Sequence, residues 1–233
     1  MKYLITSLMI VIGSSASAFH AILGSNYGWE DHQVTTTWSA QRREFADEPS
    51  YTSESTRLGI RIVRNDSIPG NNNKYHIEIN APINHKLADH LANILPQLNQ
   101  KNRYATVVYL NSPGGSGSAG LRIGKMFRQY SVQAIVTNQQ TCASACADMF
   151  IGAKYRSIYH TGTVETHAPY RENANGTITC VKEYADTARP YRHFALQMLG
   201  HEKGLRYFKD SFRVCSRIYL KVYSSNTKWI QSK

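Results

Sequence analysis

The chain has 233 residues, of which 42% are hydrophobic, and it carries a formal net charge of +11 at pH 7. This length supports one substantial hydrophobic core, and it fits one domain with an extension better than two equal domains. The 27 basic residues are scattered, without a run of five or more, which indicates a solvated basic surface rather than a specific nucleic-acid site.

The first twenty residues have the pattern of a secretory signal peptide. Lys2 precedes a short apolar run over Leu4–Ile12, and the small residues at 16–18 predict cleavage just after Ala18. The run is too short to cross a bilayer of about 30 Å, and no later stretch approaches about 18 consecutive apolar residues. We therefore expect a periplasmic or secreted protein without a transmembrane span. The alternative is a retained start that anchors the chain to a membrane.

The mature chain divides into two parts by composition. Residues 19–56 are polar and mixed, and we expect them to form an N-terminal extension. Residues 57–233 form the predicted main domain. It opens with a predicted strand over 58–63, where apolar and polar residues alternate, followed by a loop over 66–73 that is rich in asparagine.

Buried strands and amphipathic helices alternate from residue 75 onward, which predicts an α/β domain with right-handed crossovers. Pro96 predicts a bend in the first helix or its early end. Continuous or alternating apolar runs predict the strands, and apolar residues at helical spacing predict the helices. The predicted strands cover 75–79, 105–110 and 132–136, and the predicted helices cover 84–98 and 118–130.

Two short segments carry residues suited to catalysis. Asn-Ser-Pro-Gly-Gly at 111–115 ends a strand just before a helix, where glycine N–H groups are unobstructed and can bind an anion. Thr-Cys-Ala-Ser-Ala-Cys at 141–146 places Ser144 at the start of a buried helix. Each segment alone also has a purely structural interpretation, as a tight connection and as a helix N-cap.

These segments, together with Glu-Thr-His-Ala-Pro at 165–169, resemble the ClpP/crotonase superfamily, and in particular exported relatives of the Clp protease proteolytic subunit. The resemblance covers roughly residues 75–169. Gly115 precedes Ser144 by 29 residues, and His167 follows Ser144 by 23 residues, in the order and near the separations that the family uses. The resemblance implies an α/β fold of stacked ββα spiral units with an N-terminal extension.

The resemblance also implies a serine hydrolase site. Ser144 would be the nucleophile and His167 its general base, because a serine hydroxyl needs a base to attack at neutral pH. The backbone N–H groups of Gly115 and Ala145 would bind the oxyanion. His160 follows a predicted strand, and we expect it to be structural or exposed.

A third residue should orient the histidine, since the family places an aspartate downstream of the base after a long helix. Residues 186–199 predict that helix, and Asp210 is then the best-placed carboxylate. Asp186 and Glu183 are weaker candidates. A Ser–His pair without an acid can still work, but more slowly.

The four cysteines have several possible uses. Export permits disulfides, and four cysteines allow three complete pairings. Cys142 and Cys146 flank Ser144, as in poorly characterised exported relatives of the peptidase, and they are close enough in sequence for bonding. We favour Cys142–Cys146, with Cys180–Cys215 as the second bridge. The alternative is that Cys142 and Cys146 stay reduced and buried, and structural zinc is disfavoured because no second well-spaced Cys/His pair is present.

The sequence therefore predicts an exported serine peptidase that cleaves peptides or unfolded proteins by acyl-enzyme chemistry, without cofactor, metal or ATP-driven partner. ATP is scarce outside the cytoplasm, so an unfoldase is not expected. A homo-oligomer is compatible with the resemblance. The family's rings stack through a handle segment, which residues 170–184 match poorly. Within this segment, Asn175-Gly176 predicts a hairpin turn. The alternatives are a catalytically silent binding module of the cell envelope and a crotonase-like acyl-CoA enzyme.

Overall fold

A computed structural model describes residues 57–64, 75–102, 104–216 and 220–231, all within one compact unit. The predicted signal peptide (1–18), the extension (19–56) and the loop at 66–73 lie outside the described residues. No helix in the described ranges is long and apolar enough to cross a membrane.

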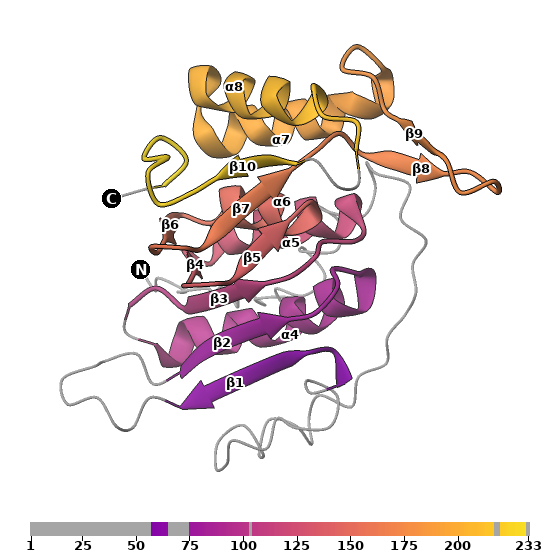
Figure 1. Cartoon of the computed structure of the whole chain (residues 1–233). Coiled ribbons are helices and arrows are strands. Elements are labelled where there is room, and N and C mark those ends of the chain that lie inside the picture. The colour runs from indigo at the N-terminus through magenta and orange to yellow at the C-terminus, as the bar shows by residue number, and fades with distance from the viewer. Residues whose placement is uncertain (1–56, 65–74, 103, 217–219, 232–233) are drawn as a thin grey trace, which may run out of the picture. The chain divides into compact units, whose positions relative to one another are not determined.

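A five-stranded sheet forms the centre of the fold (Figure 1). Only its first strand runs antiparallel to its neighbour, and the other pairings are parallel. Parallel neighbours need crossover connections, which here are helices. In the order of pairing, the strands are β1 (Ile60–Arg64), β2 (Tyr75–Asn80), β3 (Val107–Asn111), β4 (Gln133–Val136) and β6 (Tyr155–Ile158).

Helices α4 (His85–Lys101), α5 (Gly117–Gln129) and α6 (Ala145–Gly152) lie behind this sheet in Figure 1. Asn84 caps α4 by accepting a hydrogen bond from the Leu87 N–H at 2.9 Å. The prediction that Pro96 ends the helix early is wrong, because α4 continues to Lys101. Burial of the apolar residues on both sides of the proline outweighs the loss of one backbone hydrogen bond.

A second, smaller sheet, whose strand pairing forms a second layer, runs beside the first sheet. It contains β5 (Thr141–Ala143), β7 (Thr163–Thr166) and β10 (Lys221–Tyr223), in the order β10-β7-β5. Two isolated bridges, Ile83 with Gly115 and Ser112 with Cys142, extend this layer toward β2. Successive crossovers therefore pass from a strand of the first sheet through the second layer into a helix, which is the ββα unit expected from the resemblance.

The C-terminal part places two helices over α6. The hairpin of β8 (Tyr170–Glu172) and β9 (Ile178–Cys180) projects from the body in Figure 1, and its turn contains Gly176 at φ 80°, as the Asn-Gly pair predicted. The chain then passes through a short 3₁₀ turn, η1 (Asp186–Ala188), into α7 (Arg189–Leu199) and α8 (His201–Phe212). These two helices pack on each other, and α7 also contacts α6.

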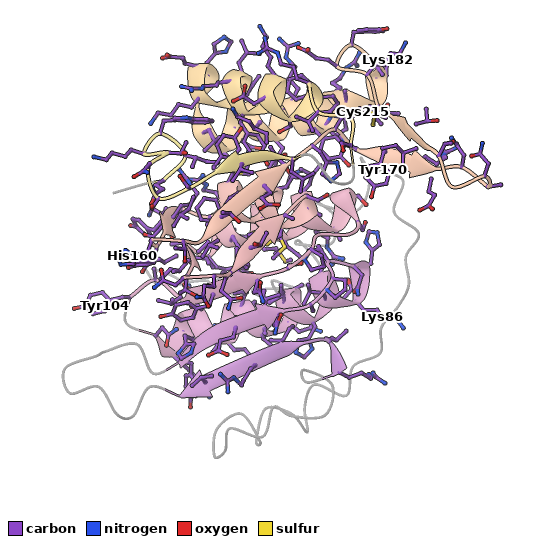
Figure 2. All side chains as sticks on the ribbon, in the orientation of Figure 1. Lys86, Tyr104, His160, Tyr170, Lys182 and Cys215 are labelled. Atoms are coloured by element: carbon purple, nitrogen blue, oxygen red, sulfur yellow. A yellow bond between two sulfur atoms is a disulfide. The ribbon has the colours of Figure 1, made fainter. Side chains whose placement is uncertain are left out.

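Both disulfide pairings favoured by the sequence are present. Cys142 and Cys146 join β5 to α6, with their Cα atoms 5.1 Å apart. Cys180 and Cys215 join β9 to the segment after α8, with their Cα atoms 5.8 Å apart, and Cys215 is labelled in Figure 2. The second bridge therefore ties the hairpin to the C-terminal helices.

Removing the outer bridge should lower stability substantially. The Cys180–Cys215 bond closes a span of 35 residues, and the chain-entropy relation assigns about 4 kcal/mol to a loop of that length. We expect the Cys180→Ser/Cys215→Ser variant to lose about that much free energy of unfolding in urea titrations. Thr179→Ser, on the same strand, should change it by less than about 1 kcal/mol. An unchanged unfolding midpoint for the double variant would contradict this expectation.

Candidate active site

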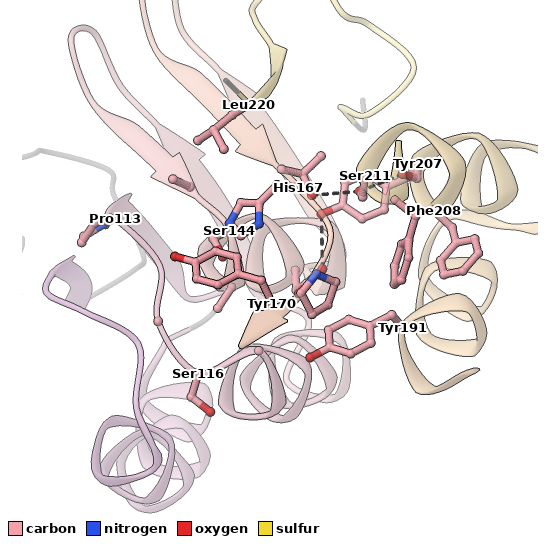
Figure 3. Close-up of a pocket in the computed structure, with 18 residues that line it drawn as sticks. Pro113, Ser116, Ser144, His167, Tyr170, Tyr191, Tyr207, Phe208, Ser211 and Leu220 are labelled. Atoms are coloured by element: carbon pink, nitrogen blue, oxygen red, sulfur yellow. Dashed lines mark hydrogen bonds between the residues drawn. The ribbon is translucent and has the colours of Figure 1, made fainter. Parts of the chain in front are cut away.

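The segments singled out by the sequence meet in one pocket of about 390 Å³ (Figure 3). Its wall is formed by the turn before α5, the start of α6, the end of β7, and helices α7 and α8. Four of the residues that line it are the predicted nucleophile, base and oxyanion donors, namely Ser144, His167, Gly115 and Ala145.

Ser144 occupies a strained turn between β5 and α6. Its backbone has φ 56° and ψ −120°, a region that side-chain-bearing residues rarely adopt. The turn is held by hydrogen bonds from the Ser144 N–H to the Glu165 carbonyl at 2.7 Å and from the Ala147 N–H to the Ser144 carbonyl at 2.8 Å. The Ser144 side chain makes no N-cap hydrogen bond, so the purely structural interpretation of this serine is not supported. The Cys142–Cys146 disulfide encloses the turn.

The two glycines of the 111–115 segment pack closely against neighbouring turns of the backbone. Gly114 has φ 92°, and a Cβ atom there would lie 2.6 Å from both the Ala143 carbonyl oxygen and the Ser144 Cβ. Gly115 has φ 144° and packs equally closely against the backbone of Ile83. A side chain at Gly114 would push the serine turn away, and one at Gly115 would push Ile83 away, so the site requires glycine at both.

Two backbone N–H groups are available beside Ser144. Ala145 is the first residue of α6, where an N–H has no partner within the helix. Within the described residues, neither its N–H nor that of Gly115 donates a hydrogen bond to a turn, loop or cap. Because the positive end of the α6 dipole adds to these donors, this corner of the pocket favours an oxyanion.

His167 follows β7 and lines the pocket beside Ser144 in Figure 3. Its Nδ1 lies 2.8 Å from the Ala168 carbonyl oxygen, which can only accept, so the neutral ring carries its proton on Nδ1. Nε2 is then the basic nitrogen. The Tyr170 ring packs against the imidazole with centroids 5.3 Å apart. Among the described residues, no hydrogen bond joins the side chains of Ser144 and His167. Catalytic hydrogen bonds of this kind often form fully only when substrate is bound.

Asp210 does not contact His167. It lies on α8, where its carboxylate accepts a hydrogen bond from the Tyr223 hydroxyl at 3.4 Å and lies 4.0 Å from the Arg206 Nε. The α8 residues that line the pocket are Tyr207 and its neighbours Phe208, Ser211 and Phe212, whereas Asp210 is directed toward β10. The position that an acid would occupy on the histidine Nδ1 is taken by the Ala168 carbonyl.

The remaining sequence candidates also lie away from the pocket. Asp186 is exposed and pairs with Arg189 at 2.8 Å, and Glu183 is exposed. His160 is exposed, as expected, and lies on the opposite side of the view from Tyr170 in Figure 2. In the described ranges no group of three or more His, Cys, Asp or Glu side chains is arranged to hold a metal ion.

Sequence reasoning missed Asp148, a carboxyl that lines the pocket one helical turn after Ser144. It is enclosed by protein, with only part of its surface toward the pocket. Burial raises the pKa of Asp148 to about 7, although the Tyr207 hydroxyl, which donates to it at 3.3 Å, lowers that pKa. The signal that could have found it is a single carboxylate in an otherwise apolar helix, four residues after Ser144.

The fold and the site together define a ClpP/crotonase-like protein, with ββα units that bring a glycine turn to a strained serine. The family model for Clp protease matches residues 65–199, and the chain belongs to that family. No curated protein is similar enough in sequence to count as a match.

Solved structures of proteases share the fold. The 1510-N membrane-bound stomatin-specific protease, solved as a mutant in complex with a substrate peptide, is 16% identical with a TM-score of 0.51, over 65% of this chain and 68% of that one. A second mutant of the same protease is 15% identical with the same TM-score, over 65% and 72%. ClpP1 from Listeria monocytogenes is 22% identical with a TM-score of 0.48, over 66% of this chain and 86% of its own.

Replacing Asp148 with asparagine should alter the pH dependence of stability. The carboxyl has an ordinary pKa of 3.8 and a pKa of about 7 in the folded protein, so the folded state binds its proton more tightly. Stability gained from the protonated form is therefore complete below about pH 4 and is lost as pH rises through 7. Between pH 4 and 8 we expect Asp148→Asn to gain up to about 4 kcal/mol relative to the unaltered protein, measured by denaturant unfolding. A difference that does not change with pH would contradict the assignment.

Proposed function

We propose that the protein is an exported serine peptidase that hydrolyses peptides or unfolded proteins without ATP, through an acyl-enzyme on Ser144. The observation that carries the proposal is the convergence of four groups on one pocket: a serine in a strained turn, a histidine, and two N–H groups. Acyl transfer needs a nucleophile, a base and an oxyanion site within one reacting distance.

The proposed reaction follows from these groups. His167 Nε2 takes the hydroxyl proton as Ser144 Oγ attacks the scissile carbonyl carbon. The oxyanion that forms accepts hydrogen bonds from the N–H groups of Gly115 and Ala145. The imidazolium then gives its proton to the leaving amine as the C–N bond breaks, which leaves an ester on Ser144. Water, deprotonated by His167, hydrolyses this ester and regenerates the serine.

The Ala168 carbonyl, rather than Asp210, is proposed as the group that orients His167. The 2.8 Å contact to Nδ1 supports this assignment because it fixes both the ring and its tautomer. A carbonyl carries only a partial charge, so it stabilises the imidazolium less than a carboxylate would. We therefore expect a slower enzyme than one with a full Ser-His-Asp triad.

Two further features support the proposed cellular compartment and the proposed independence from an ATPase. The two disulfides are typical of an oxidising compartment such as the periplasm or the exterior of the cell. All the groups proposed for the reaction belong to one chain, so the proposed chemistry needs no residue from an ATPase partner or from a ring. A homo-oligomer remains compatible with the proposal.

A fluorophosphonate should label Ser144 covalently. We expect Ser144→Ala to abolish labelling, and His167→Gln to slow it by about 10²-fold or more, because the general base is lost. Intact-mass spectrometry and peptide mapping would measure the adduct. The matched controls are Ser118→Ala, at a half-buried position, and His193→Gln, at an exposed one, which both lie outside the pocket lining and should label at the normal rate. Absence of any labelling of the folded, oxidised protein would favour the silent binding module instead.

The glycine turn gives a separate test of the oxyanion site. In Gly114→Ala the new methyl group would overlap the Ala143 carbonyl and the Ser144 Cβ, which pushes the Gly115 N–H away from the nucleophile. Because loss of one oxyanion donor costs about 10²–10³ in turnover, we expect labelling to slow by that factor. Gly176→Ala, which has φ 80° but no neighbour within 4 Å, controls for the strain of alanine at positive φ and should label normally. Normal labelling of Gly114→Ala would contradict the proposed oxyanion site.

A further inference from the structure

The pocket contains a negative group that the proposed mechanism does not use. Asp148 is a carboxyl residue in its lining, and no lysine or arginine lines the pocket within the described residues. None of the ion pairs formed by the described residues includes Asp148. The carboxylate therefore lacks a positive partner within that part of the protein, which is costly for a buried charge.

The position of Asp148 suits contact with substrate. It lies on α6 four residues after Ser144, the residue that precedes the helix, so it is about one helical turn, roughly 5–6 Å along the axis, from the serine, and both residues line the pocket. A substrate side chain that enters the pocket beside the nucleophile would therefore end near this carboxyl.

Several aromatic side chains line the pocket together with Asp148. Tyr191 of α7 and Phe208 and Phe212 of α8 line the pocket, and the Phe212 ring centroid lies 6.2 Å from that of Tyr191 and 4.4 Å from that of Phe208. Such a lining accommodates a methylene stem, and a carboxylate in the same pocket accommodates a charged end. Lysine and arginine are the side chains that combine these two parts.

We propose that Asp148 makes the pocket selective for peptides that carry lysine or arginine on the acyl side of the scissile bond. The inference rests on the peptidase function proposed above and adds its substrate class. An incoming ammonium or guanidinium would supply the missing countercharge, whereas an uncharged side chain would leave the carboxyl unpaired.

The surroundings of Asp148 make this selectivity depend on pH. Tyr207 from α8 and Tyr191 from α7 face it as phenols, His167 lines the same pocket, and on the α5 side Gly124 brings no side chain. The pKa values of both tyrosines are raised, first by burial, so the phenols stay neutral. Since burial raises the pKa of Asp148 to about 7, the carboxyl is mostly ionised at pH 8.5 and mostly protonated at pH 5.5. The preference for a basic side chain should therefore be strong at the higher pH and weak at the lower.

Two peptidyl diphenyl phosphonates that differ only in this side chain, lysine or norleucine, test the inference. At pH 8.5 we expect the lysine probe to label Ser144 at least about tenfold faster, and Asp148→Asn to reduce that ratio to about one. Glu202→Gln, which removes one negative charge from the exposed surface of α8, should keep the ratio of the unaltered protein. Equal labelling by the two probes, or a ratio that Asp148→Asn leaves unchanged, would overturn the inference.

The same experiment separates the inference from the function on which it rests. If neither phosphonate nor the fluorophosphonate labels Ser144, the peptidase proposal itself fails. If both phosphonates label it equally, the peptidase stands and only the selectivity is lost. If the Asp148→Asn variant does not fold, the test uses the unaltered protein and measures the ratio of lysine-probe to norleucine-probe labelling rates at pH 5.5. We expect a fall of at least about threefold from the value at pH 8.5, and a constant ratio would contradict the role of Asp148.

Discussion

The close approach of two backbone turns determines the arrangement of the whole site. Gly114 packs so tightly on the Ser144 turn that a Cβ atom there would lie 2.6 Å from both the Ala143 carbonyl oxygen and the Ser144 Cβ, and Gly115 packs as tightly on the backbone of Ile83. This packing brings Gly115 and Ser144 into the lining of one pocket, and it depends on the second layer of pairing, in which Ser112 bridges Cys142 and Ile83 bridges Gly115. Because β2, β3 and β4 are parallel neighbours, the segments that follow them leave the same edge of the sheet and can form these bridges.

The strain at Ser144 is balanced by the structure on both sides of it. Its N–H is held by the Glu165 carbonyl of β7, and the Cys142–Cys146 disulfide joins the strand before the turn to the helix after it. Because Glu165 lies two residues before His167, the hydrogen bond that holds the Ser144 turn also holds the strand that leads into His167. The serine and the histidine are thus positioned by shared backbone rather than by a hydrogen bond between their side chains.

Residues with a local pattern were predictable from the sequence, and residues that depend on tertiary contacts were not. Buried strands, amphipathic helices, the Gly-Gly turn and the Asn175-Gly176 hairpin follow from periodicity and turn chemistry, and the structure contains them. The early helix end predicted from Pro96 was wrong because the packing of α4 outweighs one lost hydrogen bond. Asp210 was chosen by its distance along the chain, which does not determine the direction of a helical side chain. Asp148 was overlooked because its burial arises from α7 and α8, which are distant in sequence.

The most direct test of the account is a crystal structure of the protein with a peptide boronic acid that ends in boro-lysine. We expect a covalent bond from boron to Ser144 Oγ, one boronate oxygen within hydrogen-bond distance of both the Gly115 and Ala145 nitrogens, and the His167 imidazole at the other hydroxyl. Boron bound away from Ser144, or an adduct whose oxygen faces away from those two nitrogens, would contradict the account.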